Sequence, residues 1–355
     1  TGFFIGFKLI EAVFHYAELV ANPQDFILST RGSLMGGIFI AAISVYLKWT
    51  ANQKTKLDTP KEIEKTVHPY ELVGNITMIA AVSGIIGAKI FHNLENMEDF
   101  LENPVEQLMA FSGLTFYGGL IFGAISVIWY TKKYKINTLH LCDATGPALM
   151  LAYGVGRIGC HLSGDGDWGV FNSAYAVNNM GVITESISGG FELVKENFHL
   201  ILLQIQNLPP DGVVQDIAFL KPDFLSFLPD WMFAYDYPNN VIHSGDLLQN
   251  CTDTYCSHLP APVYPTAFYE VVICLLIFSF LWAIRKRIRI PGMLFCIYLA
   301  MNGVERFFIE KIRVNTPYPI LGGITQAEII SFCLILTGLL GCIILYKKNN
   351  KRTIL

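Results

Sequence analysis

The sequence predicts an all-α polytopic membrane protein. Hydrophobic residues make up 52% of the 355 residues and charged residues only 15%, which is little charge for a water-soluble globular protein. Several apolar stretches reach the length that a helix needs to cross a bilayer. The charged residues are concentrated between these stretches, so the formal net charge of −4 gives no information about binding partners.

Seven transmembrane helices are expected, at about residues 31–48, 70–91, 109–130, 138–160, 263–284, 291–312 and 322–346. Residues 1–30 precede them as an extracytoplasmic segment. Within it, residues 3–20 are apolar but interrupted by charged side chains, which favours an amphipathic helix at the membrane surface. The chain starts at Thr1 rather than at a methionine, so we expect residues to be missing before it, and we see no signal peptide.

The connections between the spans orient them. Lysine and arginine gather in alternate connections and in the C-terminal tail, at residues 48–65, 132–135, 285–289 and 347–352. Residues 92–107 contain five acidic residues and no lysine or arginine. Because basic connections stay in the cytoplasm, we expect the N-terminus outside and the C-terminus inside.

The long connection between the fourth and fifth spans predicts a small extracytoplasmic head insert. It is rich in proline, asparagine, aspartate and aromatic residues, and it is long enough for a small core. Cys251 and Cys256 lie in it, and an oxidising compartment favours a disulfide between them over two free thiols. The chain is thereby divided into residues 1–30, residues 31–169 with four spans, the head at 170–262, and residues 263–355 with three spans and a cytoplasmic tail.

Other classes of site find little support in the sequence. The six remaining cysteines fall in the expected spans, where cysteine is most simply a small apolar residue. Asp165 and Asp167 have too few potential partners for a calcium loop. We see no glycine-rich nucleotide loop and no basic nucleic-acid patch, and a transporter is disfavoured because we see no inverted repeat. We therefore expect no metal and no nucleic-acid partner.

The strongest signal for a site is Arg157, which lies among glycines near the outer end of the fourth span, in residues 153–169. An arginine at membrane depth costs several kcal/mol unless an anionic group meets it. The sixth span carries four polar residues at spacings of four, four and three, which places them on one helical face: Asn302, Arg306, Glu310 and Arg313.

Further polar side chains from other spans are expected at the same outer depth, namely Lys89, Tyr117, Glu270 and Gln326. Arg157, Arg306 and Lys89 exceed Glu270 and Glu310 by one positive charge. The expected ligand is an anionic lipid headgroup, because guanidinium groups match phosphate oxygens. Each residue also has a structural explanation, such as an intrahelical Arg306–Glu310 pair or a lysine that extends to the interface. Asp143, at the other end of the fourth span, is interpreted as a helix-end cap or packing residue.

These residues resemble the motifs of the prolipoprotein diacylglyceryl transferases of bacterial inner membranes. The resemblance covers roughly residues 31–169 and 263–346, in the family's order. Its motifs are Gly156-Arg157-Ile158-Gly159 with the acidic turn Gly164–Gly169, Thr115–Gly119 for Ser-Phe-His-Gly-Gly, Tyr264–Glu270 for His-Pro-Ser-Gln-Leu-Tyr-Glu, Arg306, Glu310 and Arg313 for Arg-x-x-x-Glu-x-x-Arg, and Thr325-Gln326 for Gly-Gln.

The chain departs from this pattern at several positions. Tyr117 stands where the family has a histidine, Cys160 where it has an asparagine, and Asn302 where it has a tyrosine. The acidic turn has one extra residue, so that either Asp165 or Asp167 matches the family's glutamate. The first span has Arg-Gly-Ser at residues 31–33 in place of Trp-Tyr-Gly.

The resemblance implies transfer of diacylglyceryl from phosphatidylglycerol to the lipobox cysteine thiol of a prolipoprotein, with release of glycerol phosphate and without a metal or organic cofactor. Arg157 and Arg306 would bind the phosphate and Glu310 would orient Arg306. Asp165 or Asp167 would position a substrate, and Tyr117 or His161 would act as the base. Further substrate contacts are expected from Lys89, Gly118, Gly119, Cys160, His161, Gly169, Glu270, Asn302, Arg313 and Gln326.

The departures motivate an alternative, in which the chain is a lipid-binding paralogue without transferase activity. It would then serve as a scaffold or subunit of an envelope complex, with partners bound through the enlarged head. In both interpretations the site lies at the level of the outer leaflet of a bacterial inner membrane.

Overall fold

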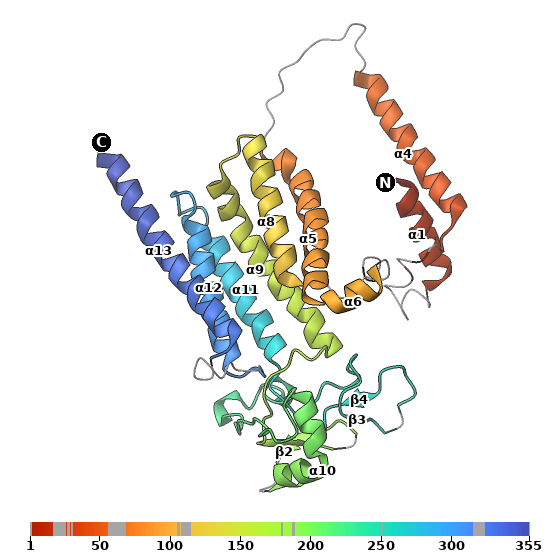
Figure 1. Cartoon of the computed structure of the whole chain (residues 1–355), viewed down its shortest axis with the longest axis vertical. Helices are drawn as coiled ribbons and strands as arrows, with labels where there is room; N and C mark the ends of the chain where they lie inside the picture. The colour runs from red at the N-terminus through yellow and green to blue at the C-terminus, as the bar shows by residue number, and fades with distance from the viewer. Residues whose placement is uncertain are drawn as a thin grey trace. The chain divides into compact units, whose positions relative to one another are not determined.

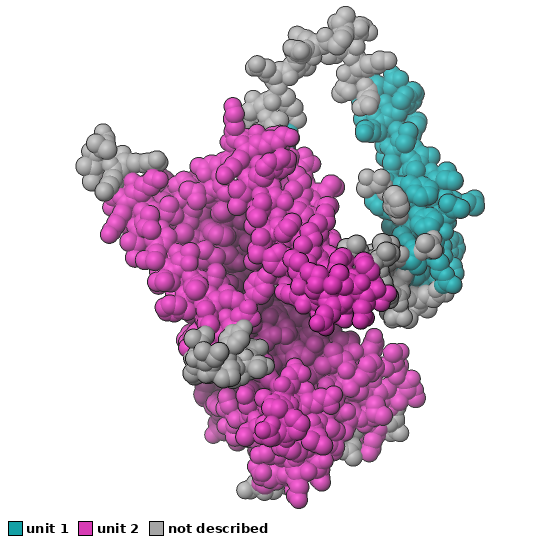
Figure 2. Space-filling model, in the orientation of Figure 1, with its two compact units in different colours: residues 1–72 teal, residues 73–355 magenta. Residues whose placement is uncertain are grey.

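The computed structural model of the chain describes residues 2–16, 26, 29, 31–55, 69–104, 107, 115–178, 180–186, 189–249, 251–314 and 324–354. The chain forms two compact units, residues 1–72 and residues 73–355 (Figure 2). Part of the expected N-terminal segment, part of the first basic connection and the start of the expected third span lie outside the described residues.

The first unit pairs two helices, α1 (Gly2–Phe14) and α4 (Leu34–Thr55), and ends in the short 3₁₀ helix η1 (Pro69–Leu72). A Cβ atom on Gly6 of α1 would lie 2.6 Å from Cβ of Ile40 on α4, so the two backbones approach closely only because residue 6 is glycine. The expected amphipathic helix at residues 3–20 is thus a helix in its described part. Its apolar surface contacts α4, and its place at the membrane surface stays a prediction.

The second unit contains long helices that run beside one another: α5 (Val73–Glu95), α8 (Phe116–Lys133), α9 (Thr138–Ser163), α11 (Thr266–Ile284), α12 (Met293–Glu310) and α13 (Gln326–Ile354) (Figure 1). The short helix α6 (Met97–Glu102) follows α5. Helix α5 packs on α8, α13 packs on α12, and α9, α11 and α12 pack on one another. Each of the seven expected spans coincides with one of these helices or with α4.

The chain is a mostly helical protein with helices suited to a membrane. Four helices of the described residues are long and apolar enough to cross a bilayer, over Leu34–Ala51, Tyr70–Glu95, Thr266–Ile284 and Gln326–Asn350. Helices α8, α9 and α12 occupy the other expected ranges. The number of spans and their orientation therefore remain predictions at this point.

The ends of α9 and α12 are fixed by local hydrogen bonds. Asn137 precedes α9, and its side chain accepts a hydrogen bond of 3.0 Å from the amide of Leu139. Asp143 of α9 accepts hydrogen bonds from the amides of Gly292 (2.6 Å) and Phe295 (2.9 Å). These amides belong to the N-cap and the first turn of α12, where a negative charge is stabilising. The interpretation of Asp143 as a helix-end cap is confirmed, although the helix that it caps is α12.

The segment between α9 and α11 forms a head with its own apolar core, at the end of the bundle where α9 ends and α11 begins (Figure 1). It contains the antiparallel pair β1 (Tyr175–Val177) and β2 (Ile183–Glu185), helix α10 (Gly190–Ile205), the 3₁₀ helices η2 (Asp223–Leu225) and η3 (Asp230–Met232), and the antiparallel pair β3 (Asp246–Leu247) and β4 (Ser257–His258). The all-α expectation thus holds for the bundle, whereas the head also has short strands. Fully buried residues of its core include Phe171, Leu202, Leu259 and Val263.

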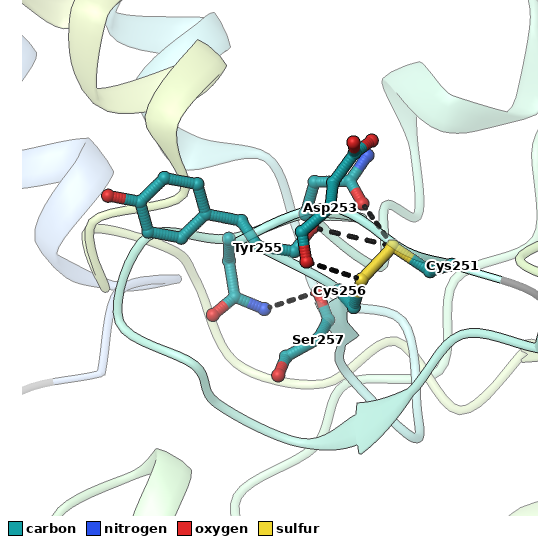
Figure 3. The surroundings of a disulfide bond; sticks show 7 residues. Cys251, Asp253, Tyr255, Cys256 and Ser257 are labelled. Carbon is teal, nitrogen blue, oxygen red and sulfur yellow. Dashed lines mark hydrogen bonds between the residues drawn. A yellow bond between two sulfur atoms is a disulfide. The ribbon is translucent and has the colours of Figure 1, made fainter. Parts of the chain in front are cut away.

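The head contains the disulfide that the sequence favoured. Cys251 and Cys256 are bonded, with Cα atoms 5.6 Å apart, in the loop that joins β3 and β4 (Figure 3). Nearby, the side-chain amide of Asn240 donates a hydrogen bond of 2.9 Å to the carbonyl of Ser257. The disulfide therefore closes a short loop on the β3–β4 pair.

Candidate active site

Six charged residues from five parts of the chain meet where the bundle joins the head. We call them the arginine–carboxylate network: Arg157 near the end of α9, Asp167 in the turn after it, Glu270 in the first turns of α11, Arg306 and Glu310 in the last turns of α12, and Arg313 just after α12. All six were candidate site residues from the sequence. The structure brings them into one connected set of ion pairs.

Glu270 is the buried centre of the network. Its side chain is 1% exposed, and one of its oxygens accepts hydrogen bonds from Tyr153 Oη (2.8 Å) and Arg306 Nη1 (3.0 Å). Arg157 Nε lies 2.6 Å from its other oxygen, as an ion pair rather than a well-directed hydrogen bond. Arg313 Nη1 lies 3.9 Å away. A carboxylate this deeply buried is stable only with such compensation, so Glu270 fixes the positions of the guanidinium groups.

Asp167 lies on the more exposed side of the same guanidinium groups. One carboxylate oxygen pairs with Arg157 and the other with Arg313, and 30% of the side chain is exposed. Burial opposes ionisation of this carboxyl, but the charges of Arg313 and Arg157 outweigh burial and hold its pKa below the ordinary value. Of the two aspartates that the sequence left open, Asp167 is therefore the one in the network. Asp165 accepts a hydrogen bond of 3.2 Å from the amide of Asp167.

Gly169 allows the chain to cross closely beside this turn. Its amide donates a hydrogen bond of 2.9 Å to the carbonyl of Tyr264, and the residue forms an isolated β-bridge with Arg313. A Cβ atom at position 169 would lie 2.6 Å from the carbonyl oxygen of Ile312. The glycine at this position of the motif is thus required by backbone packing, which brings Arg313 next to the acidic turn.

The last turns of α12 contain a further ion pair of the network, between Arg306 and Glu310. Arg306 Nη2 lies 3.6 Å from Glu310 Oε2, which is the intrahelical pair that the spacing of four allows. Thr325 Oγ1 donates a hydrogen bond of 2.6 Å to Glu310 Oε1. The expectation that Arg313 shares this helical face is wrong, because α12 ends at Glu310 and Arg313 reaches the network from the segment beyond it.

The sequence predicts an excess of one positive charge at the site, and the structure gives a different count. The predicted excess was counted with Lys89, which lies on α5, and without Asp167 and Arg313. Within the network itself, three arginines face three carboxylates, so that the formal charges balance.

Cys160 and Asn302 lie beside the network. Arg157 Nη1 donates to Cys160 Sγ at 3.7 Å, and the amide of Asn302 is 3.9 Å from the sulfur of Met150. Ligand atoms of Cys160, Asp165 and Asp167 lie within 4.8 Å of one another, which is compatible with a metal ion by distance. Both oxygens of Asp167 already pair with arginines, however, so this trio is a poor cation site.

Four other candidate residues lie on the α5–α8 pair, and one at the start of α13. Lys89 is on α5 and Gln326 begins α13, while Tyr117, Gly118 and Gly119 are in the first turn of α8. The structure explains Gly118 by packing, because a Cβ atom there would overlap the carbonyl oxygen of Gly87 on α5. Tyr117 is 41% exposed. The structure does not place these five residues among the ion pairs of the network.

His161 lies among aromatic rings rather than among the charges. Its ring centroid is 5.3 to 5.8 Å from those of Trp231, Tyr235, Tyr237 and Phe268. An apolar cavity of about 500 Å³ opens here, lined by Ile158, His161, Leu162, Trp231, Tyr235, Phe268 and Val271. His161 lies one helical turn after Arg157 on α9, so the cavity lies close to the network. Such a neighbourhood suits a ligand with a polar and an apolar part.

Two polar residues, one partly buried and one buried, escaped the sequence analysis. Tyr153 resembled one more aromatic residue in an apolar stretch, yet its hydroxyl donates to Glu270. Glu305 is 3% exposed, and neither of its carboxyl oxygens has a hydrogen-bond partner among the described residues. An acidic residue inside an apolar helix was the available signal. It was passed over because residue 305 is one step from Arg306 and points about 100° away from it around the helix.

Comparisons with known proteins agree with the motifs. A family model described as prolipoprotein diacylglyceryl transferase matches residues 33–344. A phosphatidylglycerol–prolipoprotein diacylglyceryl transferase of Staphylococcus xylosus is 25% identical over 283 residues, which are 79% of this chain and 77% of that protein. One from Clostridium botulinum is 24% identical over 283 residues, 79% of this chain and 84% of that protein. One from Clostridium tetani is 33% identical over 104 residues, 29% of this chain and 42% of that protein.

Proposed function

The chain belongs to the prolipoprotein diacylglyceryl transferase family, and we propose that it transfers the diacylglyceryl group of phosphatidylglycerol to the lipobox cysteine thiol of a prolipoprotein. The products are a thioether on the cysteine and glycerol phosphate. The observation that carries this proposal is the convergence of three arginines, from α9, α12 and the segment after α12, on one buried carboxylate. Guanidinium groups held in this way are suited to bind a phosphate.

The proposed site lies at the outer surface of a bacterial inner membrane. Seven spans with an external N-terminus place the basic connections in the cytoplasm. They place the head, the end of α9 and the start of α11 on the opposite side. The network lies at that end of the bundle, next to the head (Figure 1), and is therefore at the depth of the outer-leaflet headgroups. The apolar cavity beside it suits the hydrocarbon part of a lipid.

In the proposed reaction, the thiolate sulfur attacks the glycerol carbon that carries the phosphate. The S–C bond forms as the C–O bond breaks, and the bonding electron pair leaves on the phosphate oxygen. Negative charge therefore grows on the phosphate, where Arg157 and Arg306 stabilise it. Glu270 holds both arginines in place before the substrate arrives, and such preorganisation is a major source of rate enhancement.

The thiol must lose its proton for this attack, because a free cysteine has a pKa of about 8.5. Tyr117 and His161 are the two candidate bases, and the proton passes from the base to solvent. His161 lines the cavity and lies one helical turn after Arg157 on α9, whereas Tyr117 lies at the exposed start of α8. The position of His161 beside the network favours it as the base, and comparison of His161→Ala with Tyr117→Phe separates the two roles.

The test of the phosphate role is substitution of Arg157. Arg157→Lys keeps the charge but loses the planar fork, and we expect it to lower the transfer rate by about 10²- to 10³-fold, as loss of one stabilising donor does in other enzymes. Lys311→Ala is the matched control, since Lys311 is also basic and near the end of α12 but pairs with Glu328 of α13. Full turnover by a folded Arg157→Lys protein would exclude the proposed role.

The alternative function is lipid binding without transfer, in a scaffold or subunit of an envelope complex. Tyr117 in place of the family's histidine is the observation that favours it, because a tyrosine has an ordinary pKa of about 10. A protein that binds phosphatidylglycerol but modifies no peptide, and gains transfer in Tyr117→His, would support this alternative.

A further inference from the structure

Two carboxylates of the network, Glu270 and Asp167, differ in exposure and in partners, and the difference indicates that a bound anion can replace Asp167. Glu270 is 1% exposed, on a helix, and bonded to Tyr153 as well as to arginines. Asp167 has a side chain that is 30% exposed, and in the described residues its carboxylate pairs only with Arg157 and Arg313. It spans two guanidinium groups as the two oxygens of a phosphate would. Of the two carboxylates, only Asp167 can leave the arginines without exposing a buried core.

The formal charges of the network also indicate that an anion can replace Asp167. Without Asp167, the three arginines of the network face only Glu270 and Glu310, which leaves one positive charge. Glu305 is not included in this count, because neither of its carboxyl oxygens has a hydrogen-bond partner among the described residues. A phosphodiester with one negative charge would therefore replace Asp167 charge for charge. A zwitterionic headgroup would bring an additional cation to a site that is already neutralised.

The local backbone allows this exchange with little movement. Thr266 Oγ1 donates a hydrogen bond of 3.2 Å to the carbonyl of Asp167, and the next residue, Trp168, is 2% exposed in the core of the head. The backbone is therefore anchored at Asp167 itself and at the residue that follows it. Release of the arginines requires rotation of one partly exposed side chain, and such rotations are fast.

We propose that Asp167 occupies, in the lipid-free protein, the position that a phosphodiester monoanion takes between Arg157 and Arg313. This inference rests on the proposed function for the identity of the lipid, and it adds Arg313 to the phosphate-binding residues. It makes Asp167 a determinant of specificity: a lipid gains the arginines only if it brings the one negative charge that Asp167 gives up. Phosphatidylglycerol brings this charge alone, whereas a zwitterionic phospholipid brings the same phosphodiester charge together with a cation that the neutralised site would also have to accommodate.

The test uses the full chain in a neutral detergent and inorganic phosphate as the probe. Thermal unfolding is followed in phosphate and in sodium chloride of equal ionic strength. If Asp167 holds the arginines nine-tenths of the time, its loss raises the affinity for an anion about tenfold. We therefore expect the dissociation constant of phosphate to be about tenfold lower for Asp167→Asn than for the unmodified chain.

Two controls isolate the charge of Asp167. Asp165→Asn removes a carboxylate from the same turn that does not pair with the arginines, and Asp167→Glu keeps the negative charge. Both are expected to bind phosphate as the unmodified chain does. Equal phosphate affinity in Asp167→Asn and Asp165→Asn would overturn the inference. If Asp167→Asn folds poorly in chloride, recovery in phosphate alone supports it, and Asp167→Ser provides a second neutral variant for the same comparison.

A lipid arm separates this inference from the proposed function. Nanodiscs with phosphatidylglycerol or with phosphatidylcholine alone are compared for the same variants, and transfer is measured in parallel. Transfer by the unmodified chain without a gain in anion affinity in Asp167→Asn would contradict the inference and leave the function intact. A gain with phosphate, but no phosphatidylglycerol binding and no transfer, would support the anion exchange and contradict the proposed function.

Discussion

Two buried carboxyls at nearly the same depth make a matched pair for testing how the network is stabilised. Glu270 is 1% exposed and contacts three arginines and Tyr153. Glu305 is 3% exposed, and its oxygens have no hydrogen-bond partner among the described residues. Both residues change in size very little on replacement by glutamine, so that the two substitutions differ mainly in the charge interactions that they remove.

Glu270→Gln leaves the arginines without their central counter-charge. Removal of one partner from a buried ion pair typically costs about 3–5 kcal/mol, and we expect a loss of unfolding free energy in that range. Glu305→Gln removes no hydrogen bond among the described residues, and we expect a change below about 1 kcal/mol.

The assay is unfolding by sodium dodecyl sulfate in mixed micelles, followed by circular dichroism, with both variants measured beside the unmodified chain. The difference between the two variants is the informative quantity, because it cancels effects of volume and of detergent. Equal losses for Glu270→Gln and Glu305→Gln would refute the reasoning, since burial rather than ion pairing would then decide both. A larger loss for Glu305→Gln would show that Glu305 is ionised and paired.

Three further outcomes are expected. Gly118→Ala should lower the unfolding free energy by about 1–3 kcal/mol, because its Cβ atom would overlap the carbonyl of Gly87. Gly156→Ala should not, because apart from the backbone of its own helix and its chain neighbours no described atom lies within 4 Å of the added Cβ. Equal losses in the same micelle assay would argue against the close α5–α8 crossing. Asp143→Ala should lower the unfolding free energy by about 1–2 kcal/mol, because it removes the cap of α12. Asp143→Asn keeps an acceptor and should restore part of this free energy. Circular dichroism during unfolding measures both variants, and no loss in Asp143→Ala would exclude the cap. The folded-state pKa of Asp167 is lowered, so the stability that its carboxylate contributes is fully present above the unfolded pKa of about 3.9 and is lost as the pH falls from there through the folded-state pKa. Melting temperatures between pH 2 and 7 should show this loss in the unmodified chain and not in Asp167→Asn. An unchanged acid profile in the variant would contradict this contribution.

The helices of the bundle were predictable because long apolar stretches have few alternatives in a membrane protein. Their ends were less so: α4 continues to Thr55 and α13 to Ile354, beyond the apolar parts of the sequence that defined the spans. The strands of the head could not be located, because each is two or three residues long. Strands so short are fixed by pairing with distant segments, and not by a local pattern.

The same division holds for the site. The Arg306–Glu310 pair follows from a helical spacing of four and was predictable. The pairing of Asp167 with Arg313 joins residues 146 positions apart and depends on the close crossing of the chain at Gly169. No local rule states which aspartate of a glycine-rich turn would face the arginines, which is why Asp165 and Asp167 stayed equivalent until the structure separated them.

The central claim is that this chain modifies a cysteine with a lipid, and mass spectrometry of a lipobox peptide tests it most directly. The peptide is incubated with the purified chain and phosphatidylglycerol of one defined acyl composition. We expect the cysteine to gain the mass of one diacylglyceryl group, and glycerol phosphate to appear in equal amount. An unmodified peptide, from protein that demonstrably binds phosphatidylglycerol, would contradict the transferase and favour the lipid-binding paralogue.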